Sequence, residues 1–153
     1  PGFNDGLVSV QDVAAQLAAR LLDLQSNQHV LDACAAPGGK TAYIAALIHS
    51  RGEVVALDRF ESRLKLLQKN MERLQVDCVR SVAIDALEYN SLPFDRILID
   101  VPCSGTGTLS KKPDIKWRRD IFDIRDLNKT QLKLLSKAAE LYGCDCSMSL
   151  SLL

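Results

Sequence analysis

A run of small residues after an apolar segment has the composition of a loop that binds a small molecule. The run consists of Cys34, Ala35, Ala36, Pro37, Gly38, Gly39 and Lys40. Paired glycines let the backbone approach a ligand and adopt dihedral angles that other residues avoid. A segment of helical pattern follows from Thr41, and the free N–H groups at the start of a helix favour an anionic group. We therefore expect a ligand with a negatively charged end.

One class of ligand for such a loop is a nucleotide phosphate. A P-loop requires Gly-x-x-x-x-Gly-Lys-Ser/Thr. Here the first glycine position is taken by Cys34, and Pro37 removes one of the N–H donors that would hold phosphate. The phosphate site is therefore incomplete, although a degenerate P-loop hydrolase stays open as an alternative.

The other class is a nucleoside cofactor, for which an acidic residue about 20 positions beyond the loop accepts hydrogen bonds from the ribose. Asp58 fits this requirement, because it ends the strand-like segment 53–58 and stands 19 residues after Gly39. An Asp in this place could instead cap the next helix. The loop and Asp58 together favour the nucleoside.

Length and composition narrow the class of protein. The 153 residues suffice for the core of one domain, and 19 basic residues balance 19 acidic ones. Any contact with RNA must therefore depend on a local basic patch. Five cysteines, an odd number without zinc-finger spacing, argue against a disulfide framework and against a metal site.

The sequence lacks the patterns of a membrane protein. No apolar run reaches the length of a membrane span, and residues 1–5 do not resemble a signal sequence. We expect a cytoplasmic monomer with no membrane partner.

Short apolar segments alternate with helical patterns along the chain. Strands are predicted at 28–33, 53–58, 78–84 and 95–100, and helices at 10–24, 39–49, 61–74 and 123–142, the first with a capping box formed by Ser9 and Asp12. This order predicts an α/β fold with a Rossmann-like, doubly wound, mainly parallel sheet. The ends of the strands would bring Asp32, Asp58, Asp85 and Asp100 to one edge, where ligands bind in such sheets.

Residues 95–107 form a second motif, in which a buried strand leads to Asp100 and a short loop presents Cys103. Asp100 alone also resembles the magnesium-binding Asp of a P-loop enzyme. Cys103 stands beside small residues that expose the backbone, where a lowered pKa would make a thiol reactive. The alternative is a small buried cysteine in a turn, which is our interpretation of the thiol of Cys34.

The two motifs together resemble the RNA (cytosine-5) methyltransferases that use S-adenosylmethionine. The resemblance is carried by Asp32–Thr41, Asp58, Asp85, Asp100–Gly107 and Lys112–Trp117, and it extends over residues 1–142. It is strongest to bacterial members that act on 16S-type ribosomal RNA. It implies a class I methyltransferase fold, S-adenosylmethionine as cofactor and ribosomal RNA as partner.

The family assigns roles to these positions. Residues 34–40 would surround the methionine part of the cofactor, Asp58 would bind the ribose and Asp85 the adenine side. Asp100 would lie beside the methionine amino group or the target base. By itself Asp85 could simply end a strand. Two cysteines act on the base in this family: one attacks C6 so that C5 can accept the methyl group, and the other, matched by Cys103, assists product release.

The chain departs from the family pattern after the helix at 123–142. The family has a fifth strand and a Thr-Cys motif there, of which only Cys146 and Ser147 remain. We therefore expect a partial methyltransferase domain at 1–142, an atypical tail at 143–153, and impaired attack by Cys146, because covalent catalysis requires precise placement. A fragment that binds cofactor or RNA without catalysis is the remaining alternative.

A basic cluster surrounds the single tryptophan. It consists of Lys111, Lys112, Lys116, Arg118 and Arg119 around Trp117. Basic groups can neutralise phosphates while an aromatic ring stacks on a base. The alternative is a solvated loop with Trp117 packed into the core.

Overall fold

The computed structural model describes residues 2–105, 113–114, 117 and 121–142. Helices and strands alternate as the sequence predicts. Their order is α1 (Val13–Arg20), β1 (Gln28–Asp32), α2 (Gly39–Leu47), β2 (Gly52–Asp58), α3 (Glu61–Arg73), β3 (Val79–Ala83), β4 (Arg96–Leu98) and α5 (Ile121–Leu141). The predicted α/β class is confirmed, and the predicted tail at 143–153 lies outside the described residues.

The four strands form one parallel sheet in the order β3-β2-β1-β4. The central strands β1 and β2 contain the valines and leucines typical of strands buried on both faces, and Val30 of β1 pairs with Val54 of β2. The order reverses between β1 and β4, since the chain runs outward from β1 to β3 and then returns to the other side of β1. This reversal is the place where open α/β sheets bind ligands.

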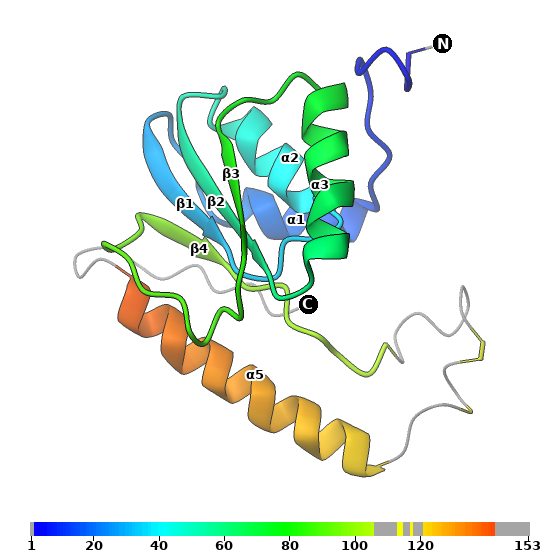
Figure 1. The fold of residues 1–153 in the computed structure, drawn as a ribbon, viewed down its shortest axis with the longest axis vertical. Helices are drawn as coiled ribbons and strands as arrows, with labels where there is room; N and C mark the ends of the chain where they lie inside the picture. The colour runs from blue at the N-terminus through cyan, green and yellow to red at the C-terminus, as the bar shows by residue number, and fades with distance from the viewer. Residues whose placement is uncertain (1, 106–112, 115–116, 118–120, 143–153) are drawn as a thin grey trace.

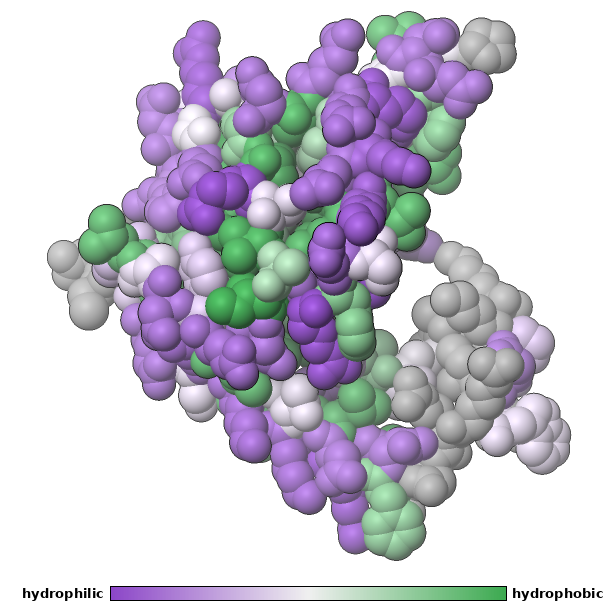
Figure 2. All heavy atoms as spheres, viewed as in Figure 1, coloured by the Kyte–Doolittle hydropathy of each residue, from purple (hydrophilic) through white to green (hydrophobic). Residues whose placement is uncertain are grey.

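Helices cover the two faces of the sheet as separate layers (Figure 1). One face packs on α1, α2 and α3 through clusters that include Ala19, Ile44 and Leu67. The opposite face packs on α5 through a cluster that includes Leu134 and Ala138. The outer surfaces of α3 and α5 are mainly hydrophilic in the space-filling view, as expected of helices with one buried face (Figure 2).

The first helix is shorter than predicted. It begins at Val13 rather than at residue 10, because Asp12 is the N-cap and its side chain accepts a hydrogen bond from the N–H of Ala14. The predicted capping box with Ser9 and the predicted end at residue 24 are therefore wrong. The buried face consists of small residues, Ala18 and Ala19, followed by Leu22 after the helix. Val13, Leu17 and Leu21 are exposed.

The segment before α1 is held against the end of α3 by Arg73. Its guanidinium lies over the ring of Phe3, 4.0 Å from the centroid, and donates to the carbonyl oxygens of Phe3 and Val8. Gly6 has a φ of +74°, and a Cβ there would lie 1.9 Å from the carbonyl oxygen of Arg73. Only glycine fits this position.

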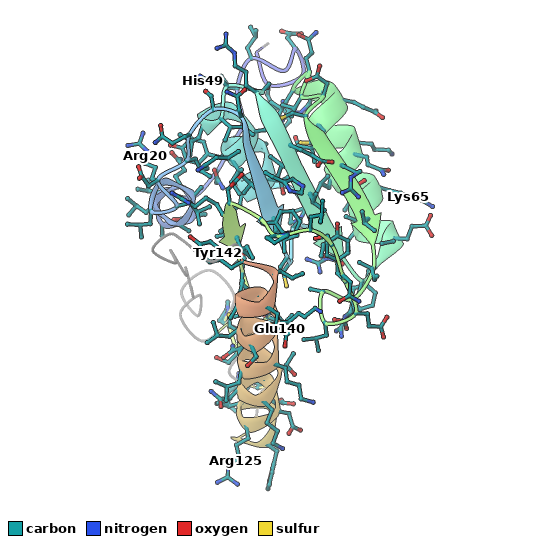
Figure 3. The ribbon with its side chains drawn as sticks, turned by 90° about the vertical axis from the view of Figure 1, so that its left-hand side faces the viewer. Arg20, His49, Lys65, Arg125, Glu140 and Tyr142 are labelled. Atoms are coloured by element: carbon teal, nitrogen blue, oxygen red, sulfur yellow. The ribbon has the colours of Figure 1, made fainter. Side chains whose placement is uncertain are left out.

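Helix α5 packs on the sheet by its C-terminal half. Leu134, Ala138 and Leu141 are buried, and the N–H of Phe94 donates to the carbonyl oxygen of Leu141. In the side view the helix extends away from the sheet, with Glu140 and Tyr142 near it and Arg125 at the far end (Figure 3). The middle of α5 can therefore form a wall beyond the edge of the sheet.

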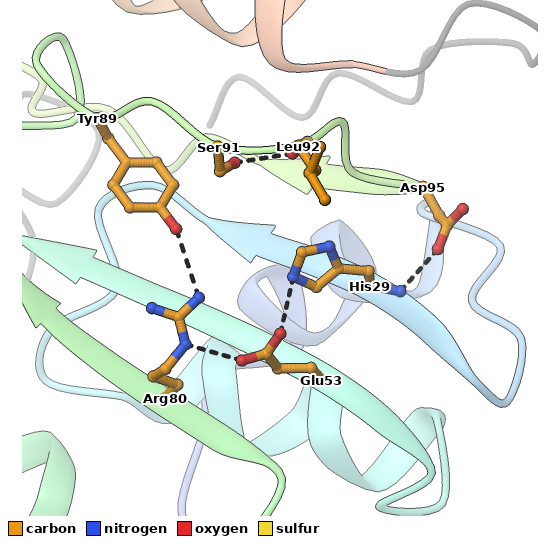
Figure 4. Close-up of polar contacts among 7 residues, drawn as sticks. All are labelled: His29, Glu53, Arg80, Tyr89, Ser91, Leu92 and Asp95. Atoms are coloured by element: carbon orange, nitrogen blue, oxygen red, sulfur yellow. Dashed lines mark hydrogen bonds and ion pairs between the residues drawn. The ribbon is translucent and has the colours of Figure 1, made fainter.

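Polar side chains cross the same face of the sheet near the start of β1, β2 and β3 (Figure 4). Glu53 lies 2.8 Å from Arg80 Nε and 2.9 Å from His29 Nε2, although the histidine nitrogen lacks hydrogen-bond geometry. Arg80 also contacts the hydroxyl of Tyr89 at 3.5 Å. These contacts tie the segment between β3 and β4 to the sheet, away from the ligand edge.

Candidate functional site

A cavity of about 210 Å³ opens at the carboxyl edge of the sheet. Residues from the segments after all four strands and from α5 line it: Ala33, Cys34, Ala36, Asp58, Arg59, Phe60, Arg63, Ile84, Asp85, Ala86, Leu87, Asp100, Pro102, Thr130 and Leu134. Its position matches the ligand site of doubly wound sheets. Three of the four acidic residues predicted for this edge therefore meet at one cavity.

Asp58 is the most buried of these three acids. It is 5% exposed, and both of its carboxylate oxygens are hydrogen-bonded or ion-paired. Oδ1 accepts from the backbone N–H of Phe60 at 2.9 Å, and Oδ2 lies 2.8 Å from Nη1 of Arg63. The N-cap of α3 is Phe60, without a side-chain bond, so Asp58 stabilises the turn before the helix and does not cap it.

Asp85 and Asp100 stand on opposite sides of the sheet's centre. Oδ1 of Asp85 accepts from the N–H of Leu87 at 3.0 Å, which holds the carboxylate at the wall of the cavity. Oδ2 of Asp100 lies 2.7 Å from Nζ of Lys40, in a partly buried ion pair. The ammonium of Lys40 is thus held by a side chain and does not face an open phosphate nest.

The loop with the paired glycines, residues 34–40, connects β1 to α2 and forms the floor of the site. The N–H of Ala35 donates to the carbonyl oxygen of Leu57, and the N–H of Gly38 donates to that of Ala35. Gly38 has a φ of +99°, and a Cβ there would lie 2.8 Å from Cγ of Leu67 in α3. Its conformational freedom therefore serves the turn and the close packing of α3, in addition to any approach by a ligand.

A second cavity, of about 250 Å³, lies on the other side of the loop. It shares Cys34, Ala36 and Asp100 with the first cavity. It differs by including Lys40, Asp32 and residues at the start of the chain's first helical region. The full lining is Val10, Gln11, Asp12, Ala15, Asp32, Cys34, Ala35, Ala36, Pro37, Gly39, Lys40 and Asp100. Lys40 belongs to this cavity rather than to the first. The ion pair between Lys40 and Asp100 thus marks the boundary of the two spaces.

Asp32 lies at the same edge but is buried. It is 1% exposed, its Oδ2 accepts from the hydroxyl of Thr41 at 2.8 Å, and its Oδ1 has no hydrogen-bond partner among the described residues. Burial raises the pKa of Asp32 to about 6, the nearby Asp100 adds to the rise, and the bond from Thr41 and the charge of Lys40 oppose it. Near neutral pH the carboxyl is close to its titration range.

The two cysteines of the motifs differ in environment. Burial, together with the surrounding carboxylates of the strand ends, raises the pKa of Cys34 to about 12, so its thiol stays protonated and non-nucleophilic. Cys103 is exposed, and the alternative of a small buried cysteine is wrong for this residue. Cys146, predicted as a catalytic residue, lies outside the described residues.

Sequence reasoning missed Arg63 and the contribution of α5. Arg63 contacts both Asp58 and the carbonyl oxygen of Ala36, and Thr130 and Leu134 close the cavity from α5. An arginine in the first turn of the helix after a strand-end Asp was the available signal for Arg63. Of the basic cluster only Trp117 is described; it is 83% exposed, so its packing into the core is excluded.

A family model described as "16S rRNA methyltransferase RsmB/F" matches residues 19–148, most of the chain. The chain belongs to this family. The resemblance inferred from the sequence is thereby confirmed, and the methyltransferase hypothesis is favoured over the P-loop hydrolase. Within the described residues, no helix is both long and apolar enough to cross a membrane.

Curated relatives of this RsmB/F chain carry the same description. It is 48% identical to the ribosomal RNA small subunit methyltransferase B of Pseudomonas syringae, over 88% of this chain and 31% of the relative. It is 41% identical to the probable ribosomal RNA small subunit methyltransferase B of Bacillus subtilis, over 91% of this chain and 32% of the relative. The chain therefore spans about a third of the length of these relatives.

Two solved structures from Pyrococcus horikoshii have the same fold. The structure of NSun6 from Pyrococcus horikoshii with SFG matches with a TM-score of 0.85 and 30% identity, over 93% of this chain and 37% of that chain. A methyltransferase homologue from Pyrococcus horikoshii matches with a TM-score of 0.83 and 34% identity, over 94% of this chain and 45% of that one. The Rossmann-like fold inferred from the sequence is that of these methyltransferases.

Proposed function

We propose that this chain binds S-adenosylmethionine in the first cavity. It thereby provides the cofactor-binding part of an active site that methylates C5 of a cytosine in ribosomal RNA. The observation that carries the proposal is the convergence of Asp58, Asp85 and Asp100 on one cavity with apolar walls. Carboxylates suit the hydroxyls, the amino group and the positive charge of such a cofactor, and alanine and leucine side chains suit its adenine. The related NSun6 structure with SFG, an analogue of the cofactor, supports the same ligand class.

The three acids then contact different parts of the ligands. Asp58, held by Phe60 and Arg63, accepts the hydrogen bonds of the ribose hydroxyls. Asp85 accepts from the adenine side, and Asp100 faces the methionine amino group at the boundary of the two cavities. Residues 34–40 close around the methionine part at the boundary of the two cavities, since Cys34 and Ala36 line both of them while Lys40 lines the second. The first turn of α2 directs free N–H groups toward its carboxylate. When bound, the cofactor supplies a methyl group on a positively charged sulfur.

The second cavity is suited to the target base. Lys40 and Asp100 present a donor and an acceptor 2.7 Å apart. Cytosine has an amino donor beside ring and carbonyl acceptors, so a carboxylate and an ammonium complement its edge. Because this cavity shares Cys34, Ala36 and Asp100 with the first, a base bound there lies beside the cofactor. The exposed thiol of Cys103 belongs to the same loop as Asp100 and has the product-release role of the family pattern.

Methyl transfer by the whole protein needs both thiols. We expect cofactor binding from this chain and weak or no turnover, because only Cys146 and Ser147 match the Thr-Cys motif of the family and covalent attack requires precise placement. Ribosomal RNA would be contacted by the basic cluster around the exposed Trp117, and this contact would weaken with salt. The basic residues themselves lie outside the described residues.

The test combines binding with transfer. Radiolabelled S-adenosylmethionine is equilibrated with the chain, and transfer of its methyl group to unmethylated small-subunit ribosomal RNA is then measured. We expect retained cofactor with little transfer, and transfer restored when a fifth strand and a Thr-Cys segment are appended. Failure to retain the cofactor at millimolar concentration contradicts the proposal.

A further inference from the structure

Arg63 joins two of the segments that line the first cavity. Its Nη1 lies 2.8 Å from Oδ2 of Asp58, after β2, and its Nη2 donates to the carbonyl oxygen of Ala36, after β1, at 2.6 Å. The side chain itself is half exposed and lines the cavity. One guanidinium therefore fixes the distance between the loop and the strand-end acid.

The geometry of an arginine is needed for this link. A guanidinium is planar and offers several donors in a fixed fork, whereas a lysine ammonium is a single point charge. The fork reaches the carboxylate and the carbonyl oxygen from two separate nitrogens, Nη1 and Nη2, in fixed directions, whereas a lysine would have to reach both from a single nitrogen. The carboxylate of Asp58 is almost fully buried, and such a charge is costly unless it is paired.

The contacts leave Asp58 able to bind a ligand. Phe60 N–H occupies one lone pair of Oδ1 and Arg63 occupies one of Oδ2. Each carboxylate oxygen has a further acceptor site. Two neighbouring hydroxyls can therefore donate to Asp58 while Arg63 stays in place.

We propose that Arg63 is a positioning residue for the ribose: it holds the carboxylate of Asp58 in the orientation that accepts the two ribose hydroxyls and keeps the wall at Ala36 at the matching distance. The inference rests on the proposed binding of S-adenosylmethionine in the first cavity. The proposal predicts an effect that depends on the ligand. Loss of Arg63 weakens ligands that carry the ribose hydroxyls and leaves ligands without them nearly unaffected.

The experiment is calorimetric titration of four forms of the chain with two ligands. The ligands are S-adenosylhomocysteine and its analogue that lacks both ribose hydroxyls; the forms are the wild type, Arg63→Met, Arg63→Lys and the control Lys65→Met. Lys65 lies on the same helix, is exposed and pairs with Glu61, so its substitution removes the same charge from outside the cavity.

We expect Arg63→Met to weaken S-adenosylhomocysteine at least about tenfold, as loss of a charged hydrogen-bond network does, and to weaken the analogue less than about twofold. Arg63→Lys should give an intermediate ratio, because it keeps one of the two contacts. Lys65→Met should leave the ratio unchanged. The proposal is overturned if the ratio of the two affinities in Arg63→Met equals that of the wild type. This would happen if both ligands were weakened equally, as a general loss of structure would do, or if neither ligand were weakened.

Three other outcomes would also decide the question. If Arg63→Met does not fold by circular dichroism, the ratio measured for Arg63→Lys takes its place, and a ratio equal to that of the wild type overturns the positioning role. If the wild type binds neither ligand, the proposed function itself fails, and the role of Arg63 falls with it. If the wild type binds both ligands equally, cofactor binding stands while the contact of Asp58 with the ribose is refuted.

Discussion

The ammonium of Lys40 lies 2.7 Å from the carboxylate of Asp100 and joins the first turn of α2 to the segment after β4. The two residues are 60 positions apart in the chain, and the pair forms the partition between two cavities. Its side chains are 19% and 34% exposed, so solvent screens the pair only in part. The same two charges therefore hold the sheet edge together and face the space assigned to the target base.

The first prediction concerns the coupling within this pair. Lys40→Met should lower the free energy of unfolding by about 1 kcal/mol, because it leaves a partly buried carboxylate without its cation. In the background of Asp100→Asn the same change should cost clearly less, since the charge that needs a partner is gone. Urea denaturation of both single variants and the double variant measures the difference. Simple additivity would show that the pair contributes nothing.

The second prediction concerns Asp32 and pH. Its pKa is raised to about 6 in the folded chain, so the folded state holds its proton more tightly than the unfolded state does. The resulting stabilisation is complete below the unfolded pKa near 4 and is lost as the pH rises through about 6. Relative to Asp32→Asn, which does not titrate, the wild type should lose about 2 kcal/mol between pH 4 and pH 7.

Chemical denaturation of both forms at several pH values tests this prediction. Groups that do not interact with Asp32 titrate equally in both forms, so the difference between the two forms isolates Asp32 and its immediate neighbours. Thr41→Val should steepen the dependence by raising the pKa further, because the hydroxyl of Thr41 stabilises the carboxylate. A difference that does not vary with pH would mean that Asp32 titrates normally.

The third prediction separates the two loop glycines. Gly38→Ala should destabilise the chain by about 1–3 kcal/mol, because its φ is +99° and the new Cβ would lie 2.8 Å from Leu67. Gly39→Ala is the matched control: its nearest contact would be the side chain of Gln11 at 3.7 Å, and it is not in the left-handed region. Thermal melts of the two variants should differ clearly, and equal melting temperatures would contradict the assigned geometry.

The fourth prediction concerns the ion pair between Glu53 and Arg80, near the start of β2 and β3. Arg80 lowers the pKa of Glu53, so the pair stabilises the chain above the unfolded pKa of the carboxyl and this effect is lost as the pH falls through the folded value. Both side chains are largely exposed. Glu53→Gln should therefore cost less than about 1 kcal/mol at neutral pH, and nothing in acid. A larger loss of the free energy of unfolding would show that the contacts of Arg80 with Glu53 and Tyr89 contribute more to holding the segment between β3 and β4 than an exposed ion pair does.

The sequence predicted the sheet and the edge at which its acidic residues meet, and the reasons are local. The apolar segments that became β1 and β2 are buried on both faces, and parallel strands bring their carboxyl ends together, which is why Asp58, Asp85 and Asp100 were expected at one edge. Their roles in binding stay predictions. The start of α1 was wrong because two residues, Ser9 and Asp12, can both cap a helix, and only tertiary packing decides between them.

Contacts between side chains from different elements could not be predicted in the same way. The bridge from Arg63 to Ala36 and the pair of Lys40 with Asp100 depend on distances across the fold. The family resemblance implied that Lys40 binds the cofactor, and the structure places it in the lining of the second cavity. Its role in cofactor binding stays a prediction, as does the role of Cys146.

The most direct test of the account is calorimetric titration of S-adenosylmethionine into the wild type, Asp58→Ala and the exposed control Lys65→Met. We predict one binding site in the wild type and in the control, and an affinity at least about tenfold weaker in Asp58→Ala, since a charged hydrogen-bond acceptor for the ribose is removed. Binding that is absent from the wild type, or that is indifferent to the loss of Asp58, would contradict the claim that this cavity holds the cofactor.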